Sequence, residues 1–407
     1  MNISVGLIEG QAALEVELAG RFTDNSGKPL DSGRYRFTSE VTLTPSDPAR
    51  CAFALDNVTI GIGFHWERKE RQAFRGTLRV VKRAAGLTLI NDVALEEYVT
   101  SVISSEMSAS CPLELLKAHA VISRSWLWFP KANPPGPPGQ PAQAADPHEI
   151  IRWYGREAHA DFDVCADDHC QRYQGITKAF SPAAAQAVRA TAGEFLRYDG
   201  AICDARFYKC CGGITERYAT AWEDRRIPYL ESVYDGPADG IESQSPEQWI
   251  CAKPPAYCNT QDLELLARML PGFDQETRDF YRWQVSYTPA ELADLIKAKL
   301  GVELGPIREM QPLARGPSGR IYRIRIAGER DYLIVGKELE IRRALSRTHL
   351  YSSAFVVDRE ADRFVLRGAG WGHGVGLCQI GAAVMAAQGR TYTEILRHYY
   401  PGTAVGA

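Results

Sequence analysis

The sequence lacks several features that would assign it to a common class. No apolar run approaches the about 18 residues needed to cross a bilayer, so we expect no transmembrane segment. The first residues alternate with acids and lack a charged region followed by an apolar core, so we do not interpret them as a signal peptide. Lys and Arg number 47 against 50 Asp and Glu, giving a net charge of −3. This balance argues against nucleic acid as the main ligand.

Common catalytic and nucleotide motifs are also missing. The absence of Gly-x-Ser-x-Gly, His-Glu-x-x-His and paired-Asp motifs argues against serine hydrolases and zincins. The glycine-rich segment near the C-terminus has Gln379 where a dinucleotide fingerprint would continue with glycine, and no P-loop Lys-Ser/Thr follows it. We therefore expect no nucleotide cofactor.

What is present is typical of a globular protein. The 407 residues are 45% hydrophobic and 24% charged, which predicts two or three domains or one large domain with insertions. Ten cysteines are many for a cytosolic enzyme and few for a disulfide scaffold. Their placement is therefore more informative than their number.

The periodicity predicts a mixed α+β fold with antiparallel strands. Residues 1–85 contain short alternating segments separated by Gly, Asp, Asn and Pro, which predicts a β-rich N-terminal region. We expect a larger domain over 86–404, with a Pro-rich insertion at 130–147 and a variable insertion at about 240–305. Helices are predicted at 95–106 and at 112–129, the second ending before Pro130, and further helices near 183–192, 378–389 and the TYTEILRHYY segment. Residues 320–357 are predicted to be β.

Glu106 is the most informative single residue. It lies within 40° of Val99 and Val102 on the helical wheel, on the apolar face at the C-terminal end of its helix, if each residue turns by about 100°. Burial and the helix C-terminus both disfavour the carboxylate, so we expect its pKa to be raised. A carboxylic acid that stays protonated near neutral pH suits a general acid. The alternative is a helix-end Glu that turns out to water.

Lys117 and Arg124 lie seven residues apart on a helix that is apolar nearly all round. Two cations on such a helix need either a cleft or carboxylate partners. The functional interpretation is a cleft shared with Glu106, in which the cations hold polar groups of a substrate. The structural interpretation is snorkelling or ion pairs within the protein.

The segment 159–170 offers His159, Cys165, His169 and Cys170 within twelve residues. Mixed Cys and His ligands suit tetrahedral zinc. The spacing is irregular, so a Cys165–Cys170 disulfide or free thiols stay as alternatives. Cys210 or Cys211 is a further candidate to complete the metal shell.

The loop 368–376 alternates glycines with Trp371 and His373, and Gln379 follows at a helix start. Alternating glycines permit positive φ and close backbone approach, which is typical of an active-site wall. The alternative is a tight structural turn with an incidental histidine. We expect this loop and the helices 95–106 and 112–129 to form opposite walls of one cleft.

Together these segments resemble the stage II sporulation protein D / LytB amidase-enhancer (SpoIID/LytB) family. The resemblance rests on DVALEEYVTSVISSEMSASCPLELLKAHAVISRSW (92–126), RFYKCCGGITERYATAWED (206–224) and GAGWGHGVGLCQIGA (368–382), and on the shorter segments PYLESV (228–233), IRRAL (341–345) and YSSAF (351–355). It covers most of residues 85–404. Cys211 stands where the family usually has Ser, and His119 where it usually has Gln.

The resemblance implies a peptidoglycan lytic transglycosylase with Glu106 as its single acid/base. It also implies that Lys117 and Arg124 orient the glycan, and that zinc lies next to the site with His159 and Cys165 among its ligands. Candidates for sugar binding or stacking are Tyr208, Thr215, Trp222, Trp371, His373 and Gln379. Such an enzyme would act on MurNAc-GlcNAc glycan strands and leave 1,6-anhydro ends.

Two rival functions follow from the same residues. Some relatives are described as amidase enhancers, which implies a non-catalytic glycan-binding module with a cell-wall amidase as partner. The second rival is a zinc hydrolase centred on the His/Cys segment, although catalytic zinc seldom uses many thiolates. From the substrate we expect a location in the cell envelope, and the missing signal leaves a cytoplasmic location open.

Overall fold

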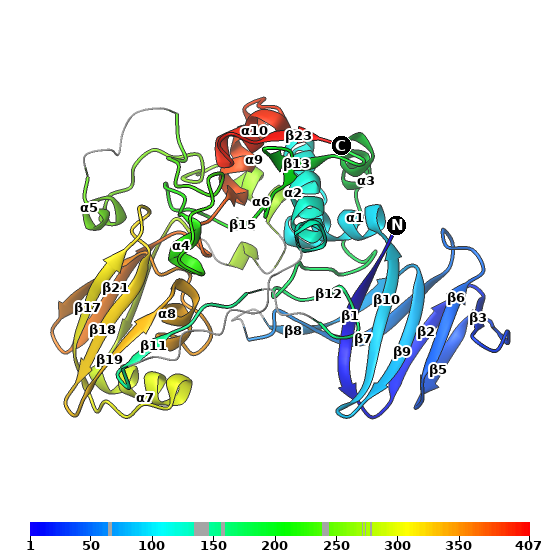
Figure 1. The fold of residues 1–407 in the computed structure, drawn as a ribbon, viewed down its shortest axis with the longest axis horizontal. Coiled ribbons are helices and arrows are strands. Elements are labelled where there is room, and N and C mark those ends of the chain that lie inside the picture. The colour runs from blue at the N-terminus through cyan, green and yellow to red at the C-terminus, as the bar shows by residue number, and fades with distance from the viewer. Residues whose placement is uncertain are drawn as a thin grey trace. The chain divides into compact units, whose positions relative to one another are not determined.

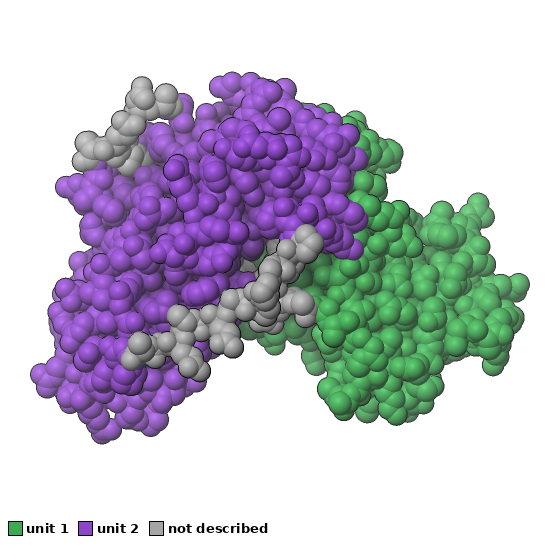
Figure 2. Space-filling view, in the orientation of Figure 1, with its two compact units in different colours: residues 1–123, 156–192, 268–271 green, residues 124–155, 193–267, 272–407 purple. Residues whose placement is uncertain are grey.

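The computed structural model describes residues 1–63, 67–133, 146–155, 159–237, 244–270, 272, 274–276 and 279–407. Its helices and mostly antiparallel sheets confirm the predicted α+β class. The chain divides into two compact units, coloured separately in Figure 2. The first unit comprises Met1–Ser123, Arg156–Ala192 and Arg268–Pro271, and the second comprises Arg124–Gly155, Gly193–Ala267 and Gly272–Ala407. The predicted domains 1–85 and 86–404 stay a prediction.

The first unit is built on two sheets, which explain the β-rich beginning of the sequence. In β2 (Leu14–Ala19), the apolar residues Leu14, Val16 and Leu18 are buried and alternate with acids, as a half-buried strand requires. The seven-stranded sheet has the order β12 (Val164–Cys165), β1 (Asn2–Gln11), β10 (Gly86–Ala94), β9 (Thr77–Arg83), β6 (Val41–Pro45), β3 (Phe22–Asp24), β4 (Pro29–Leu30). The four-stranded sheet has the order β5 (Gly33–Phe37), β2, β7 (Ala52–Ile60), β8 (Arg68–Phe74).

Three helices accompany these sheets. The predicted helix at 95–106 is confirmed as α1 (Leu95–Glu106), which follows β10 directly. The Ala-rich helix is α3 (Pro182–Ala190), capped by Ser181 with Pro182 in its first turn. The long helix is α2 (Leu113–Ala132), whose last residues belong to the second unit. It runs past the predicted end at Phe129, because the Asn133 amide donates to the Phe129 carbonyl at 2.8 Å and closes one more turn around Pro130.

Among the residues that the structure describes, the second unit contains four smaller sheets. One sheet has the order β11 (Glu149–Ile151), β19 (Tyr332–Gly336), β18 (Ile321–Gly328), β17 (Ile307–Arg315), and another has the order β16 (Arg282–Tyr287), β21 (Arg363–Ala369), β20 (Phe355–Glu360). A third sheet has the order β14 (Ala201–Ile202), β13 (Phe195–Tyr198), β23 (Ala404–Gly406). The fourth is the pair β15 (Phe207–Tyr208) and β22 (Leu377–Cys378). Its helices are α4 (Tyr218–Ala221), α5 (Pro246–Cys251), α7 (Pro289–Leu300), α8 (Glu338–Ala344), α9 (Gln379–Ala387) and α10 (Tyr392–Tyr399), with a 3₁₀ turn at Asp274–Glu276. The helix α6 (Leu263–Met269) begins in this unit, and its last two residues belong to the first unit.

Local sequence explains several of these boundaries. Thr288 and Glu291 form a capping box at the start of α7, and Gly301 ends the helix with φ +74°. Thr391 and Glu394 form the same motif at α10. The β structure predicted within 320–357 is confirmed at β18, β19 and the start of β20. The helix α8 interrupts it between β19 and β20, where it buries Ile341 and Ala344. The predicted Pro-rich insertion lies mostly outside the described residues.

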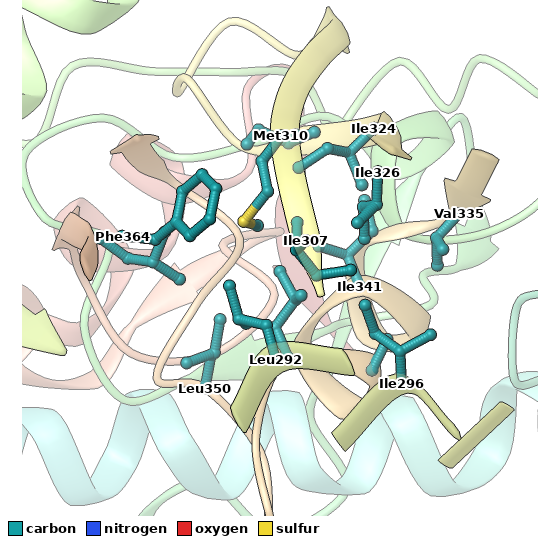
Figure 3. Close-up of a cluster of buried hydrophobic side chains, with 14 of the residues drawn as sticks. Leu292, Ile296, Ile307, Met310, Ile324, Ile326, Val335, Ile341, Leu350 and Phe364 are labelled. Atoms are coloured by element: carbon teal, nitrogen blue, oxygen red, sulfur yellow. The ribbon is translucent and has the colours of Figure 1, made fainter. Parts of the chain in front are cut away.

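A buried apolar cluster holds part of the second unit together. Figure 1 shows α7 and α8 against the sheet that contains β17, β18 and β19. Figure 3 shows side chains from these elements meeting, among them Leu292 and Ile296 of α7, Ile307 of β17, Ile326 of β18 and Ile341 of α8. The variable insertion predicted at about 240–305 therefore contributes α7 to this core.

Truncating Leu292 to alanine should destabilise the chain markedly. Leu292 has no exposed surface, so its loss leaves a cavity that costs about 2–5 kcal/mol. Urea unfolding would measure the change. Leu313→Ala is the control, because Leu313 is 43% exposed and its truncation should cost much less. Equal costs for the two variants would contradict this description of the core.

No helix in the described parts of the chain is both long and apolar enough to span a membrane.

Candidate functional site

Glu106 ends α1 and is buried, as its place on the apolar face predicts. The face formed by Leu95, Tyr98, Val99, Val102 and Ile103 is buried, and Glu106 is 9% exposed. The structure therefore excludes the alternative, in which Glu106 at the helix end turns out to water. Its acid/base role stays a prediction.

Arg172 fixes the Glu106 carboxyl group. The backbone N–H of Arg172 donates to Glu106 Oε1 at 3.0 Å, and the Arg172 guanidinium Nε lies 3.9 Å from Oε2. The same Nε makes a closer ion pair with Asp168, at 2.5 Å. The amide hydrogen bond holds the Glu106 carboxyl group in one orientation. Sequence reasoning missed Arg172, because a backbone N–H donor does not depend on which side chain the residue carries.

The four predicted metal ligands lie together in the first unit. One donor atom from each of His159, Cys165, His169 and Cys170 falls within 4.8 Å of the others. We call this set the His/Cys group. The His159 Nε2 to Cys170 Sγ distance is 3.3 Å, and His169 Nδ1 lies 3.5 Å from Cys170 Sγ and 3.8 Å from Cys165 Sγ. These separations match the edges of a tetrahedron with metal–ligand bonds of about 2.0–2.3 Å. The residues therefore fit zinc.

The environment of Cys165 favours a metal-binding thiolate. A hydrogen bond with the Cys170 thiol, and then one with His169, lower the pKa of Cys165 to about 4 against the effect of burial. Cys165 is also placed by the sheet, because β12 pairs in parallel with β1 and sets Cys165 opposite Gly6. One ligand is thus fixed to regular structure, while His159 precedes this strand and His169 and Cys170 belong to the loop that follows it.

This loop leads directly from the His/Cys group to Glu106. After Cys170, the side chain of Gln171 accepts a hydrogen bond from the Tyr98 hydroxyl at 3.1 Å, and the next residue is Arg172. Tyr98 belongs to α1, so the loop is attached to the catalytic candidate's own helix at two points. A metal bound by the His/Cys group would hold the Arg172 donor in place.

Lys117 and Arg124 have partners within the protein. Lys117 Nζ forms an ion pair with Glu114 at 2.6 Å, one turn away on α2. Arg124 has no exposed surface and donates to the Glu194 carbonyl at 2.9 Å. Lys117 belongs to the first unit and Arg124 to the second, so a cleft shared with Glu106 stays a prediction. The prediction that loop 368–376 forms the opposite wall of that cleft also stays a prediction, because this loop lies in the second unit.

The glycine loop needs its glycines. Gly370, Gly372, Gly374 and Gly376 all have φ between +77° and +100°. The loop passes close to other backbone: Trp371 bridges to Cys210, and Val375 bridges to Glu216. A side chain at Gly376 would collide with the Arg206 carbonyl. The repeated glycines thus serve both the left-handed conformation and the close approach that the sequence predicts.

Gly376→Ala should therefore destabilise the chain by about 3 kcal/mol or more, combining left-handed strain with the collision. Gly389→Ala separates the two effects, since Gly389 has φ +87° but nothing within 4 Å of an added Cβ. We expect that variant to lose only about 1–2 kcal/mol. Chemical denaturation of both variants measures the difference, and equal losses would show that close approach is unimportant.

His373 is held as a neutral ring. Burial, and then the guanidinium groups of Arg206, Arg320 and Arg342, keep the pKa of His373 well below its usual value, against a backbone hydrogen bond with Phe207. His373 Nδ1 accepts from the Val375 amide at 3.0 Å. The ring is therefore oriented from both sides, and its sugar-binding role stays a prediction.

Aromatic rings surround His373. Its centroid lies 5.3 Å from that of Tyr208 and 4.9 Å from that of Trp222. The Trp222 ring is in turn contacted by Tyr218 and by the Arg206 guanidinium, 4.3 Å from the ring centroid. Trp222 is 9% exposed and Tyr208 5%. Three predicted sugar-binding residues thus form one cluster, most of whose surface is covered by protein.

The other three predicted sugar-binding residues are buried. Thr215 Oγ1 accepts from the Val233 amide at 2.8 Å, and the residue has no exposed surface. Gln379 begins α9 and is 2% exposed, while Trp371 is 8% exposed and its ring contacts Tyr351. Their role in sugar binding stays a prediction.

Comparison with known proteins adds to this geometry. Residues 83–198, which contain Glu106 and the His/Cys group, match the sequence model of the family described as stage II sporulation protein (SpoIID). These residues are therefore similar to a SpoIID domain. Residues 216–376 match a second model, described as a domain of unknown function (DUF8618).

Similarity to the SpoIID proteins extends beyond the matched domain. The chain is 28% identical to stage II sporulation protein D of Bacillus amyloliquefaciens over 78% of this chain and 75% of that protein. It is 27% identical to stage II sporulation protein D of Bacillus subtilis (strain 168) over the same shares. It is also 23% identical to the amidase enhancer of Bacillus subtilis over 75% of this chain but 39% of that protein.

Cys211 is not grouped with the ligands of the His/Cys group. Among the residues that the structure describes, Cys211 is grouped instead with Asp235, Cys258 and Cys378 in the second unit. The prediction that Cys211 completes the metal shell of the His/Cys group is therefore wrong, and Cys211 belongs to a separate cluster. No local motif could have revealed it, because Cys211 and Cys378 are 167 residues apart.

Proposed function

We propose that this chain acts on cell-wall peptidoglycan as a lytic transglycosylase with Glu106 as its acid/base. The observation that carries the proposal is the placement of Glu106: a buried carboxyl group at the end of α1, oriented by the Arg172 amide. Ordinary glycosidases need a pair of carboxylates, to hold a water or to form a glycosyl-enzyme. A reaction in which the sugar supplies its own nucleophile needs only one.

In the proposed reaction, the Glu106 carboxyl group donates its proton to the glycosidic oxygen between MurNAc and GlcNAc. The C–O bond to the leaving sugar breaks, and the resulting carboxylate takes the proton of the MurNAc 6-hydroxyl. That oxygen attacks the anomeric carbon and closes a 1,6-anhydro ring. The nucleophile is already tethered to the reacting carbon, so proximity supplies much of the rate. Glu106 ends the cycle protonated, as it began.

The His/Cys group is proposed to hold a structural zinc ion. Two histidines and two cysteines fill a tetrahedral shell and leave no position for water, which argues against the rival zinc hydrolase. Bound zinc would supply rigidity to the loop. The chain's own contribution is the step from Cys170 to Arg172, whose amide orients Glu106.

Product analysis tests this function. Peptidoglycan glycan strands, with and without their stem peptides, would be incubated with the full chain and the products identified by mass spectrometry. Anhydro-muramic acid ends on either substrate would support the transglycosylase. Reducing ends alone would indicate hydrolysis and contradict it.

A second candidate is a glycan-binding module that enhances a partner amidase. It is favoured by the similarity to an amidase enhancer, although this chain matches only 39% of that protein. Glycan strands that are pulled down by the chain but not cut would favour it. An extracytoplasmic location is proposed for either function, because peptidoglycan lies outside the cytosol.

A further inference from the structure

Four buried side chains from distant segments converge in the second unit. They are Cys211 after β15, Asp235, Cys258 after α5, and Cys378 at the end of β22. All four have no exposed surface, and one donor atom from each lies within 4.8 Å of the others. Cys211 Sγ is 3.1 Å from Asp235 Oδ2 and 3.3 Å from Cys258 Sγ. We call these residues the three-cysteine group.

We propose that the three-cysteine group is a second, structural metal site that takes zinc, with three thiolates and the Asp235 carboxylate as ligands. This site is separate from the proposed function and does not depend on it. Its role is to tie the Cys211 turn and the end of the glycine loop to two other segments of the second unit.

The donor chemistry and spacing suit a single tetrahedral ion. Zinc binds thiolates at about 2.3 Å and carboxylates at about 2.0–2.2 Å, so its ligand atoms lie about 3.3–3.8 Å apart. The 3.1 and 3.3 Å separations in this group lie at or just below that range, so the donors would move apart by a few tenths of an ångström on binding. A disulfide would bring two sulfurs to about 2.05 Å, whereas Cys211 and Cys258 are 3.3 Å apart. The Cys378 thiol adjoins them, and the buried Cys210 thiol contacts the group from outside the four grouped donors. An iron–sulfur cluster places several atoms between its cysteines and needs a wider cage. Soft thiolates with one carboxylate favour zinc over magnesium or calcium.

Backbone amides surround the sulfurs as a metal–thiolate site requires. Cys378 Sγ accepts from the amides of Cys211 at 3.2 Å and Gly381 at 3.4 Å, and Cys211 Sγ accepts from Gly213 at 3.2 Å. Cys378 also caps the N-terminus of α9, where the helix dipole favours a thiolate. N–H donors of this kind orient the ligands and spread their negative charge.

The carboxylate ligand is oriented in the same way. Asp235 Oδ1 accepts from the Tyr399 hydroxyl at 2.6 Å, and Oδ2 accepts from the Cys258 amide at 3.3 Å. Asp235 is thus held by α10 and by the Cys258 loop together. A cation bound here would pair the negative charges that three thiolates and a carboxylate would otherwise carry in a buried site.

The proposal is tested by comparing the zinc content of the wild-type chain with that of variants. We expect Cys258→Ser to contain one zinc equivalent less than the wild-type chain after dialysis, measured by inductively coupled plasma mass spectrometry. Cys203→Ser is the matched control, because Cys203 is equally buried in the same unit but lies outside the group. It should retain the full zinc content. Equal zinc in Cys258→Ser and the wild type would overturn the site.

A second comparison separates this site from the His/Cys group. The variant Cys165→Ser/Cys170→Ser should keep the zinc of the three-cysteine group, with Zn–S distances of about 2.3 Å by X-ray absorption. If Cys258→Ser does not fold by circular dichroism, Asp235→Asn takes its place, because it keeps shape while removing a charged ligand. A wild-type chain without zinc, with iron instead, or with a Cys211–Cys258 disulfide in a non-reducing digest would overturn the proposal.

Discussion

Glu106→Gln is expected to abolish formation of 1,6-anhydro ends while leaving the fold intact. Glutamine has nearly the same shape, and its amide oxygen can still accept the hydrogen bond from the Arg172 N–H. It cannot donate the proton to the glycosidic oxygen or remove one from the 6-hydroxyl. Because acid–base catalysis contributes about 10²–10⁴-fold, the cleavage rate should fall at least that far. Mass spectrometry of the products measures it.

Glu97→Gln is the matched control for that experiment. Glu97 lies on the same helix, in its first turn, and is exposed. Its replacement changes the net charge by the same amount, so cleavage should proceed at the wild-type rate. Unfolding temperatures of both variants should stay near that of the wild type. A Glu106→Gln chain that folds and still cuts glycan would remove Glu106 from the proposed mechanism.

The second large effect is expected from the His/Cys group. In Cys165→Ser/Cys170→Ser, two of four ligands are lost and the loop that carries Arg172 is no longer held at its metal end. We expect zinc content to drop by one equivalent and cleavage to slow by about 10–100-fold, the usual cost of loosening the residues around a metal site. Metal analysis and product formation, measured on the same preparation, check both effects.

Cys51→Ser controls for loss of a buried cysteine in the first unit, since Cys51 lies outside the group. It should keep both zinc and activity. Chelation of the wild-type chain should reproduce the slow cleavage, and added zinc should restore it. A double variant that loses the metal yet cuts at the wild-type rate would show that the His/Cys group does not position Glu106.

The parts of the site that sequence could predict are those with local patterns. Helical period placed Glu106 on a buried face, and the structure confirms this because α1 begins and ends where the apolar spacing does. The His/Cys group was predictable because its ligands fall within twelve residues of each other. Alternating glycines likewise predicted a loop with positive φ, which Gly370 to Gly376 confirm.

The rest depended on contacts that no local pattern carries. Arg172 reaches Glu106 through a backbone N–H across 66 residues, and any residue type except proline supplies that donor. The three-cysteine group joins Cys211 to Cys258 across 47 residues and to Cys378 across 167. The helix α8 between β19 and β20 was likewise not predicted from the local pattern.

The division of the first unit into separate chain segments bears on how it forms during synthesis. The turn after Glu106 is fixed by late residues: the Ser108 amide donates to the Met269 carbonyl at 3.0 Å, and the Ser110 hydroxyl donates to the Arg268 carbonyl at 2.8 Å. A ribosome that has released only the two N-terminal sheets and α1 has not yet supplied these acceptors. The end of α1 that carries Glu106 therefore acquires these hydrogen bonds only after residue 269 of the 407 residues has been translated, so the arrangement proposed for acid/base catalysis cannot form before that point.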